Sequence, residues 1–274
     1  MLGGAASVQV GAALATTLFD ELGPAGTVLV RVLLAAVVLV AVWRPRPRDS
    51  TRAGLRLVAS FGVTFAAMNL CFYAAIDRIP LGIAVTLEFV GPLGVAIVAS
   101  RRRLDLAWAA LAGLGIVLLS PLPGAGLDAL GAGLALLAGG FWGGYILLAA
   151  RVGRVFSRGD GLALAMVVAA VLLLPLGVAS GGGRLLDPDL LAIGLAVALL
   201  SSAIPYSLEL EALRRLPEGT FGVLMSLEPV IAALAGLVIL GQTLSATELV
   251  AMALVVVASA GALGTSRAPA PVEA

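Results

Sequence analysis

The sequence predicts an all-α integral membrane protein with ten transmembrane helices, which form two inverted-topology repeats of five helices and place both termini in the cytoplasm. Composition is the first observation behind this prediction: 61% of the 274 residues are hydrophobic, 12% are charged, and the mean hydropathy is +1.11. A soluble domain carries about 25% charged residues, so a water-soluble globule is excluded. A disordered chain, which needs low hydrophobicity, is excluded as well. The other observations behind the prediction are the apolar segments, the distribution of the arginines and an internal repeat.

Ten apolar segments follow one another along the chain with short connections between them. Each is close to the roughly 20 residues that a helix needs to cross the hydrocarbon core, and each ends at charges, prolines or glycine clusters. No polar stretch is long enough to fold as a soluble catalytic domain. The first segment has no basic flank, and we expect a polar or basic leader before it. The segments are residues 2–19, 24–43, 53–76, 80–99, 104–121, 127–150, 159–180, 189–213, 219–240 and 246–264.

The arginines are distributed unevenly between the two sides of this arrangement. With a cytoplasmic N-terminus, fourteen of the 17 basic residues lie in inner connections, Arg78 and Arg184 lie in outer ones, and Arg31 lies inside a span. Loops rich in arginine stay in the cytoplasm. The distribution therefore predicts that both termini are cytoplasmic.

The chain contains an internal repeat, in which PLGIAVTLEFVGP at 80–92 corresponds to PEGTFGVLMSLEP at 217–229. Both segments open and close with proline, with a glycine in the first turn and a glutamate near the end. Five spans in each half is an odd number, so the second half enters the membrane from the opposite side, as in many secondary transporters with a central site. The alternative is that proline and glycine merely begin two helices alike. The predicted units are the halves 1–121 and 127–265, followed by a polar tail at 266–274.

Several kinds of reactive side chain are missing from the sequence. It contains no histidine and no lysine, and its one cysteine, Cys71, lies in an apolar run and is expected to be a buried filler. These absences exclude histidine metal sites, Ser-His-Asp triads, Schiff-base lysines and CxxC sites. A net charge of +1 gives no reason to expect a nucleic-acid partner. We therefore expect no cofactor and no metal, and predict that the chain is not an enzyme.

Ionisable residues inside the spans point to a site, because charged groups in a membrane are costly and face a cavity or a partner. Away from the span ends these residues are Arg31, Glu88 and Glu228. Glu228 is expected near the midplane, about 16 Å along a helix that starts at Pro217. Pro229 leaves the carbonyl four residues back without its donor, and a free carbonyl beside a carboxylate suits an amino group or a proton. The alternative is a proline kink that only shapes packing.

Arg31 and Glu88 are predicted to form an ion pair. Each lies seven or eight residues past a proline that begins its span at the outer face, so both are expected at a depth of about 10–12 Å. The alternative is that Arg31 snorkels to the headgroups. The uncharged candidates to complete a cavity are Gln9, Asn69, Tyr73, Thr86, Tyr145, Ser201, Ser202, Tyr206 and Ser207. Of these, Asn69, Tyr145 and Tyr206 join Arg31, Glu88 and Glu228 in the predicted substrate- or proton-binding site.

The run GGFWGG at 139–144 contains two overlapping pairs of glycines four residues apart. Gly139 pairs with Gly143, and Gly140 pairs with Gly144. Such pairs let membrane helices approach closely. Trp142 between them is either a packing residue or part of a cavity wall.

Three stretches carry a family resemblance: SVQVGAALATTLF, FYAAIDRIPLGIAVTLEFVGPL and SSAIPYSLELEALRRLPEGTFGVLMSLEPVIAALAGLVILGQTLS. They resemble the EamA-type carriers of the drug/metabolite transporter superfamily, and within it most resemble the bacterial threonine/homoserine exporters. The resemblance implies export of small neutral amino acids or related polar metabolites across the bacterial inner membrane, driven by the proton gradient. The partners it implies are a small-molecule substrate and the lipid bilayer, and a homodimer is left open. The alternatives are other cargo on the same fold (aromatic amino acids, purines or drugs) and an uncoupled channel.

Overall fold

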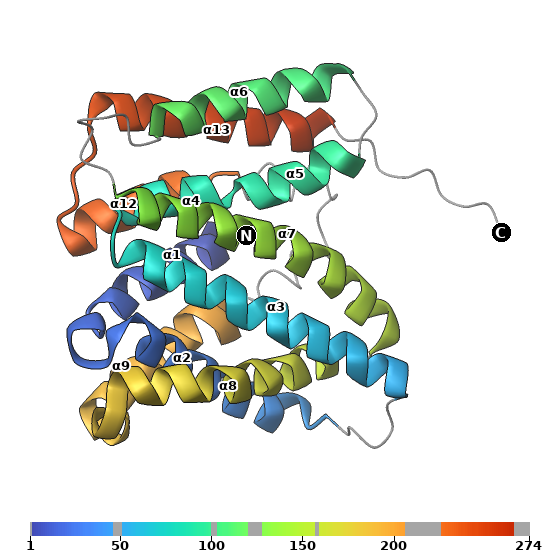
Figure 1. The fold of residues 1–274 in the computed structure, drawn as a ribbon, viewed down its shortest axis with the longest axis vertical. Coiled ribbons are helices and arrows are strands. Elements are labelled where there is room, and N and C mark those ends of the chain that lie inside the picture. Colours follow the sequence, from blue (N-terminus) through green and yellow to red (C-terminus); the bar gives the residue numbers. More distant parts are fainter. Residues whose placement is uncertain are drawn as a thin grey trace.

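The computed structural model describes residues 2–45, 51–99, 103–119, 128–156, 159–205 and 226–265, and every regular element within them is helical (Figure 1). The predicted all-α class is therefore confirmed. The elements are α1 (Leu2–Thr16), α2 (Phe19–Trp43), α3 (Arg52–Ile76), α4 (Leu81–Glu88), α5 (Val90–Ala99), α6 (Arg103–Leu119), α7 (Ala129–Val155), α8 (Asp160–Gly181), the 3₁₀ helix η2 (Gly182–Leu186), α9 (Pro188–Ala198), the π-helical turn η3 (Leu199–Ala203), α12 (Glu228–Leu240) and α13 (Ala246–Thr265).

Several of the described helices are suited to a membrane. Four of them (α2, α3, α7, and α8 continued by η2) are long and apolar enough to cross a bilayer, and shorter apolar helices accompany them. Large apolar side chains face outward, as at Val37, Val171 and Leu176, which are all more than half exposed. An outward face of this kind would be an aggregation surface in water, but it is the expected lipid-facing surface of a multi-pass membrane protein.

The helices pack as neighbouring pairs around a buried centre. The closest pairs are α2 with α8 and α3 with α7, and α6 packs on α13 at one edge of the molecule, uppermost in Figure 1. Small residues allow the close approach. A Cβ added to Gly62 of α3 would lie 2.7 Å from the carbonyl oxygen of Ala165 in α8. Such contacts are how membrane helices associate when burial of apolar surface gives no driving force.

The predicted break between the first two spans coincides with a kink inside α2. Gly23 has φ +65°, a left-handed conformation that glycine adopts without strain, and Pro24 follows it. The helical ladder is interrupted there, and side chains bond the carbonyl groups on either side of the kink. Ser180 Oγ donates to the carbonyl of Leu22 at 2.7 Å, and Thr27 Oγ1 donates to that of Gly23 at 2.9 Å.

The predicted span 80–99 is not one helix, because the α-helix stops at Glu88 and a second one begins at Val90. Pro92 has no N–H to donate to the carbonyl of Glu88 and its ring would clash there, which breaks the ladder. The break packs against α7, where a Cβ on Gly139 would lie 2.5 Å from the Glu88 carbonyl oxygen. Bare backbone at Gly139 therefore accommodates the interruption.

The predicted span 219–240 also differs from the structure, since Ser226 and Leu227 form a turn and α12 begins at Glu228. Glu228 thus lies in the first turn of a helix rather than in the middle of one. Pro229 directly after it is tolerated at this position but not in a helix interior. The path from Pro217 lies outside the described residues, as do Tyr206, the last eight residues of the predicted span 189–213 (206–213), and the tail 266–274.

Candidate functional site

A cavity of about 130 Å³ lies between the helices. A single water needs roughly 10–15 Å³ by this measure, so the cavity has room for several waters or for one small metabolite. Its lining comes from α1, α2, α3, α4, α7, η3 and α12, together with Pro205. The lining residues are Val8, Gln9, Arg31, Met68, Asn69, Phe72, Val85, Glu88, Trp142, Tyr145, Ser201, Pro205 and Glu228.

Five of the six predicted site residues line this one cavity. They are Arg31, Asn69, Glu88, Tyr145 and Glu228, contributed by five different helices. The sixth, Tyr206, lies outside the described residues. Residues separated by almost two hundred positions in the sequence are thus brought to one place, and all three ionisable residues predicted inside the spans are among them.

Arg31 is held in the centre of the protein by hydrogen bonds to uncharged groups. Its side chain is 7% exposed. Nη1 donates to Asn69 Oδ1 at 2.7 Å and to the Tyr73 hydroxyl at 3.2 Å. The guanidinium carbon lies 5.4 Å from the centroid of the Tyr73 ring, which adds a cation–π attraction. Asn69 is itself oriented by the bond from its Nδ2 to the Phe65 carbonyl at 2.9 Å.

A backbone carbonyl completes the surroundings of Arg31, and a proline explains why it is available. Nη2 of Arg31 donates to the Ser201 carbonyl at 3.4 Å. In a regular helix that carbonyl would accept from the residue four positions later, but this residue is Pro205, which has no N–H. The backbone widens to the π-helical turn η3 at this point, and such turns are frequent at functional sites. Ser7 Oγ uses the neighbouring Leu200 carbonyl in the same way, at 2.7 Å.

The predicted ion pair between Arg31 and Glu88 is wrong. Within the ranges that the structure describes, ion pairs join Arg78 to Asp128 and Arg184 to Glu21, four residues with exposed side chains that we call the outer rim, and not Arg31 to Glu88. The rotation of α2 about its axis directs Arg31 toward α3 and η3, whose oxygens satisfy it. Glu88 lines the same cavity from α4 but does not form an ion pair with the guanidinium. The alternative of snorkelling to the headgroups is also wrong, because Arg31 is buried.

The two glutamates reach the cavity from two helices that pack against each other. Glu88 is the last residue of α4 and Glu228 is the first residue of α12, and they are 9% and 5% exposed. A Cβ on Gly82 of α4 would lie 2.8 Å from Cα of Ala233 in α12. The contact between α4 and α12 therefore places both carboxyl groups beside one small space.

The remaining wall of the cavity is aromatic and apolar. Trp142 lies edge-on to Phe89, with ring centroids 5.1 Å apart, and also lines the cavity, so it serves both roles that the sequence left open. Tyr145 packs its ring on Phe61 at 5.0 Å. The apolar lining was not predicted from the sequence, because nothing in the pattern of these residues distinguishes a cavity wall from a packed helix face. It consists of Val8, Met68, Phe72 and Val85.

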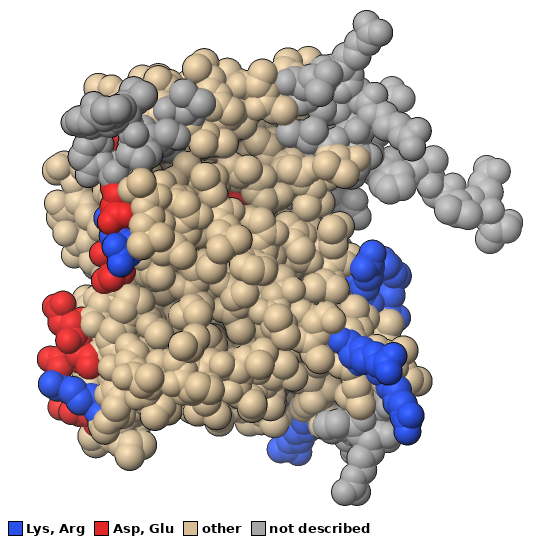
Figure 2. Space-filling view, viewed as in Figure 1, with Lys and Arg blue, Asp and Glu red and all other residues tan. Residues whose placement is uncertain are grey.

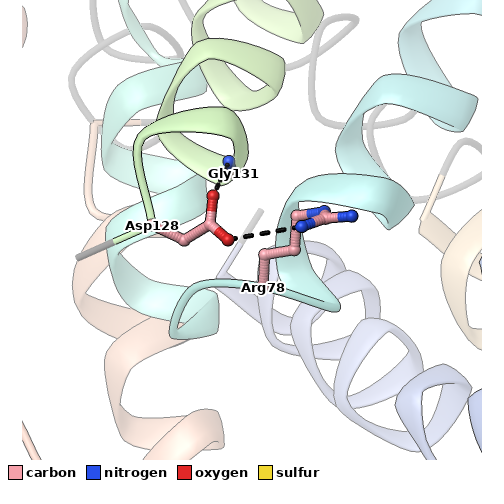
Figure 3. A network of polar contacts seen from close by, with 3 residues as sticks. All are labelled: Arg78, Asp128 and Gly131. Atoms are coloured by element: carbon pink, nitrogen blue, oxygen red, sulfur yellow. Dashed lines mark hydrogen bonds and ion pairs between the residues drawn. The ribbon is translucent and has the colours of Figure 1, made fainter. Parts of the chain in front are cut away.

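An exposed polar network joins Arg78, Asp128 and Gly131 (Figure 3). None of these three residues lines the cavity. Asp128 caps α7 by accepting from the backbone N–H of Gly131 at 2.9 Å, and Arg78 Nη1 lies 3.3 Å from its other carboxylate oxygen. The Gly131 N–H, with smaller contributions from Arg78 and the Leu130 N–H, holds the pKa of the Asp128 carboxyl below its ordinary value. A second rim pair joins Arg184 Nη2 to Glu21 Oε2 at 2.6 Å.

Comparison with known proteins places this architecture in a family. Over 265 residues the chain is 43% identical to the threonine/homoserine exporter RhtA of Escherichia coli K12, a match that covers 96% of the chain and 89% of the exporter. The chain belongs to the EamA-like transporter family. Residues 129–264 match that family directly. The predicted membership of the EamA-type carriers is thus confirmed, and the chain is a transporter, not an enzyme.

Further relatives of this EamA-like transporter agree with that assignment. RhtA of Salmonella typhimurium LT2 is 42% identical over 264 residues, covering 95% of the chain and 89% of the relative. The uncharacterized transporter YwfM of Bacillus subtilis 168 is 26% identical over 244 residues, with 85% and 81% covered. A solved crystal structure with 20% sequence identity covers 96% of both chains with a TM-score of 0.64, and supports the fold alone.

Proposed function

We propose that this EamA-like transporter is a secondary active exporter of small neutral amino acids of the threonine/homoserine kind, located in the bacterial inner membrane and driven by protons. One observation carries the proposal: a cavity between the helices is lined by one buried arginine and two buried glutamates, in a chain that is 43% identical to a threonine/homoserine exporter. Buried ionisable groups in membrane proteins mark substrate or proton pathways. The volume of about 130 Å³ suits a small metabolite.

The architecture belonging to this proposal is ten helices in two inverted repeats, 1–121 and 127–265, with the polar tail 266–274. The helix interruptions support it. The turn at Phe89 lies three residues before Pro92, and the turn at Ser226 lies three residues before Pro229. The corresponding prolines of the two proposed halves thus each follow a turn at the same spacing. The packing of α4 on α12 supports the proposal, because such repeats are expected to meet around a central substrate site.

The charges on the surface support an orientation with both termini in the cytoplasm. In Figure 2 one edge of the visible face carries basic side chains without acidic ones, and the opposite edge carries acidic side chains together with basic ones. Apart from one small acidic spot, uncharged side chains cover the broad area between the edges, as expected of a lipid-facing belt. The basic edge would face the cytoplasm by the positive-inside rule.

Uphill transport tests the function. Purified protein in proteoliposomes should concentrate labelled threonine or homoserine against its gradient when a proton gradient is imposed, and a protonophore should abolish the accumulation. An uncoupled channel would equilibrate the amino acid without concentrating it. Transport of aromatic amino acids or purines, but of neither threonine nor homoserine, would contradict the proposed substrate class.

Glu228 is the proposed proton-carrying residue, and Glu228→Gln should abolish accumulation driven by the pH gradient while the protein still inserts in the membrane. The glutamine keeps the size and the polarity of the side chain but removes its ability to exchange a proton. A matched control is Glu248→Gln. Glu248 accepts from the Ser245 N–H at 2.6 Å in an exposed capping box, a role that glutamine also fills. Normal pH-dependent export by the Glu228 variant would reduce this residue to a packing role.

A further inference from the structure

Hydrogen-bonding capacity remains unused in the wall of the cavity. Gln9 Oε1, Arg31 Nε and Ser201 Oγ are buried, and none has a partner among the residues that the structure describes. The three side chains are 3%, 7% and 4% exposed, and all three line the cavity. A buried polar atom without a partner destabilises a protein, and native structures contain few of them. Three around one cavity indicate that its normal occupant is polar.

Among the described residues, the positive and negative side chains of the cavity, Arg31 and Glu88, do not form an ion pair with each other. Arg31 is directed to the side formed by α3 and η3, where its partners are the Asn69 amide, the Tyr73 hydroxyl and the Ser201 carbonyl. None of these partners neutralises the positive charge. Glu88 lines the cavity at the end of α4, where the last carbonyls of a helix carry partial negative charge. An occupant with a negative group at one end and a positive group at the other would match both.

We infer that the cavity binds the two charged ends of an α-amino acid with different residues. Arg31, together with the Ser201 hydroxyl, binds the carboxylate, because both offer hydrogen-bond donors there. Glu88 binds the ammonium group. Glu228 keeps the proton-carrying role proposed above and is assigned to neither end of the amino acid. This inference rests on the proposed function and adds to it that the transporter recognises the zwitterion itself, and by which residues.

Binding of substrate analogues to the unmodified protein gives the first test. Isothermal titration of the purified full chain would compare L-threonine with L-threoninol, which lacks the carboxylate, and with L-threonine methyl ester, whose carboxyl group is uncharged. A fourth ligand is the hydroxy acid in which a hydroxyl replaces the amino group. Each analogue loses one charged contact, so each should bind at least about tenfold more weakly than threonine. Equal affinities for threonine and threoninol would overturn the role of Arg31.

Two variants test which residue binds the carboxylate of the amino acid and which binds its ammonium group. Arg31→Gln should weaken threonine binding about tenfold or more and leave threoninol binding unchanged, so that the preference for the carboxylate disappears. Glu88→Gln should instead remove the preference for threonine over the hydroxy acid. Arg184→Gln, at an exposed rim position, is the control that should keep both preferences. If Arg31→Gln does not fold, Ser201→Ala should still reduce the preference for the carboxylate, and an unchanged preference would count against the assignment.

The outcomes separate this inference from the proposed function. If threonine is bound and exported but the charge-deleted analogues bind equally well, the function stands and the assignment of Arg31 and Glu88 is overturned. If neither threonine nor homoserine binds, the proposed function fails, and the inference that rests on it fails with it.

Discussion

At the scale of single residues, Arg31 shows how a permanent charge is accommodated in an apolar interior without a counter-ion in contact. An arginine at the centre of a membrane helix costs at least about 2.5 kcal/mol on insertion scales. Asn69 and Tyr73 are one helical turn apart on the same face of α3, so both reach the same guanidinium nitrogen. The carbonyl left free by Pro205 supplies a third acceptor.

The network around Arg31 predicts a non-additive pair of substitutions. Asn69→Leu removes an acceptor from a buried cation and should lower the free energy of unfolding by about 1–2 kcal/mol. Arg31→Met combined with Asn69→Leu should lower the free energy of unfolding by less than the sum of the two single changes, because a lone buried charge destabilises the protein more than an apolar pair does. Thermal unfolding of the three variants in detergent measures this. Strictly additive losses would show that Asn69 does not stabilise the charge.

The lowered pKa of Asp128 predicts that the stability of the folded protein depends on pH. The folded-state pKa of this carboxyl is lowered, so its contribution to stability is complete above the unfolded-state pKa of about 3.9 and is lost as the pH falls through the folded-state value. Asp128→Asn keeps a good helix cap but does not titrate. The wild type should therefore be the more stable protein at neutral pH, and its advantage should shrink below about pH 4. Unfolding temperatures measured across this range would contradict the prediction if the difference stayed constant.

At the scale of elements, the interruption between α4 and α5 depends on bare backbone in α7. A Cβ on Gly91 of α5 would collide with the backbone of Gly139, and one on Gly139 would meet the carbonyl of Glu88. Gly143, one turn further along α7, faces the same interruption, with Val95 at 3.3 Å from such a Cβ. Of the two overlapping glycine pairs in GGFWGG, the pair Gly139 and Gly143 therefore forms the helix contact.

This contact predicts that an alanine substitution destabilises the protein at Gly139 but not at the adjacent Gly140. Gly139→Ala overfills a backbone contact and should lower the free energy of unfolding by about 1–3 kcal/mol, with a loss of export because Glu88 is displaced. Gly140→Ala is the matched control, since a Cβ there meets no described atom within 4 Å. Folded yield and transport of the two variants give the comparison. Equal behaviour would show that the approach of α7 to Glu88 is not tight.

Hydropathy and residue type predicted the helical class and the ionisable site residues, but not how the elements are broken and rotated. The rise of 1.5 Å per residue estimates how deep Arg31 and Glu88 lie, and the cavity does contain both. The helical rise does not predict the rotation of each helix about its axis, because that rotation depends on tertiary packing. In α2 the rotation directs Arg31 toward Asn69. The interruption at Phe89 was missed for a similar reason. Pro92 indicates a disturbed helix, but whether it kinks or separates depends on the fit against Gly139.

At the scale of the whole molecule, the proposed ten-helix topology predicts the side of the membrane on which each connection lies. Reporter fusions after Arg48 and after Arg158 should both give a cytoplasmic signal, and a fusion after Gly126 should give an external one, because the arginine-rich connections stay inside. An external signal at Arg158 would contradict both the ten spans and the inverted repeat.

The two ion pairs on the outer rim join residues from different predicted halves: Arg78 with Asp128, and Glu21 with Arg184. Both pairs are exposed, and exposed pairs contribute about 0–1 kcal/mol and are screened by dissolved ions within a Debye length of about 10 Å at 0.1 M salt. The contact of α4 with α12 is buried and is not screened in this way. The attraction between the halves at this rim therefore varies with the ionic strength of the surrounding medium, whereas their attachment at the centre does not.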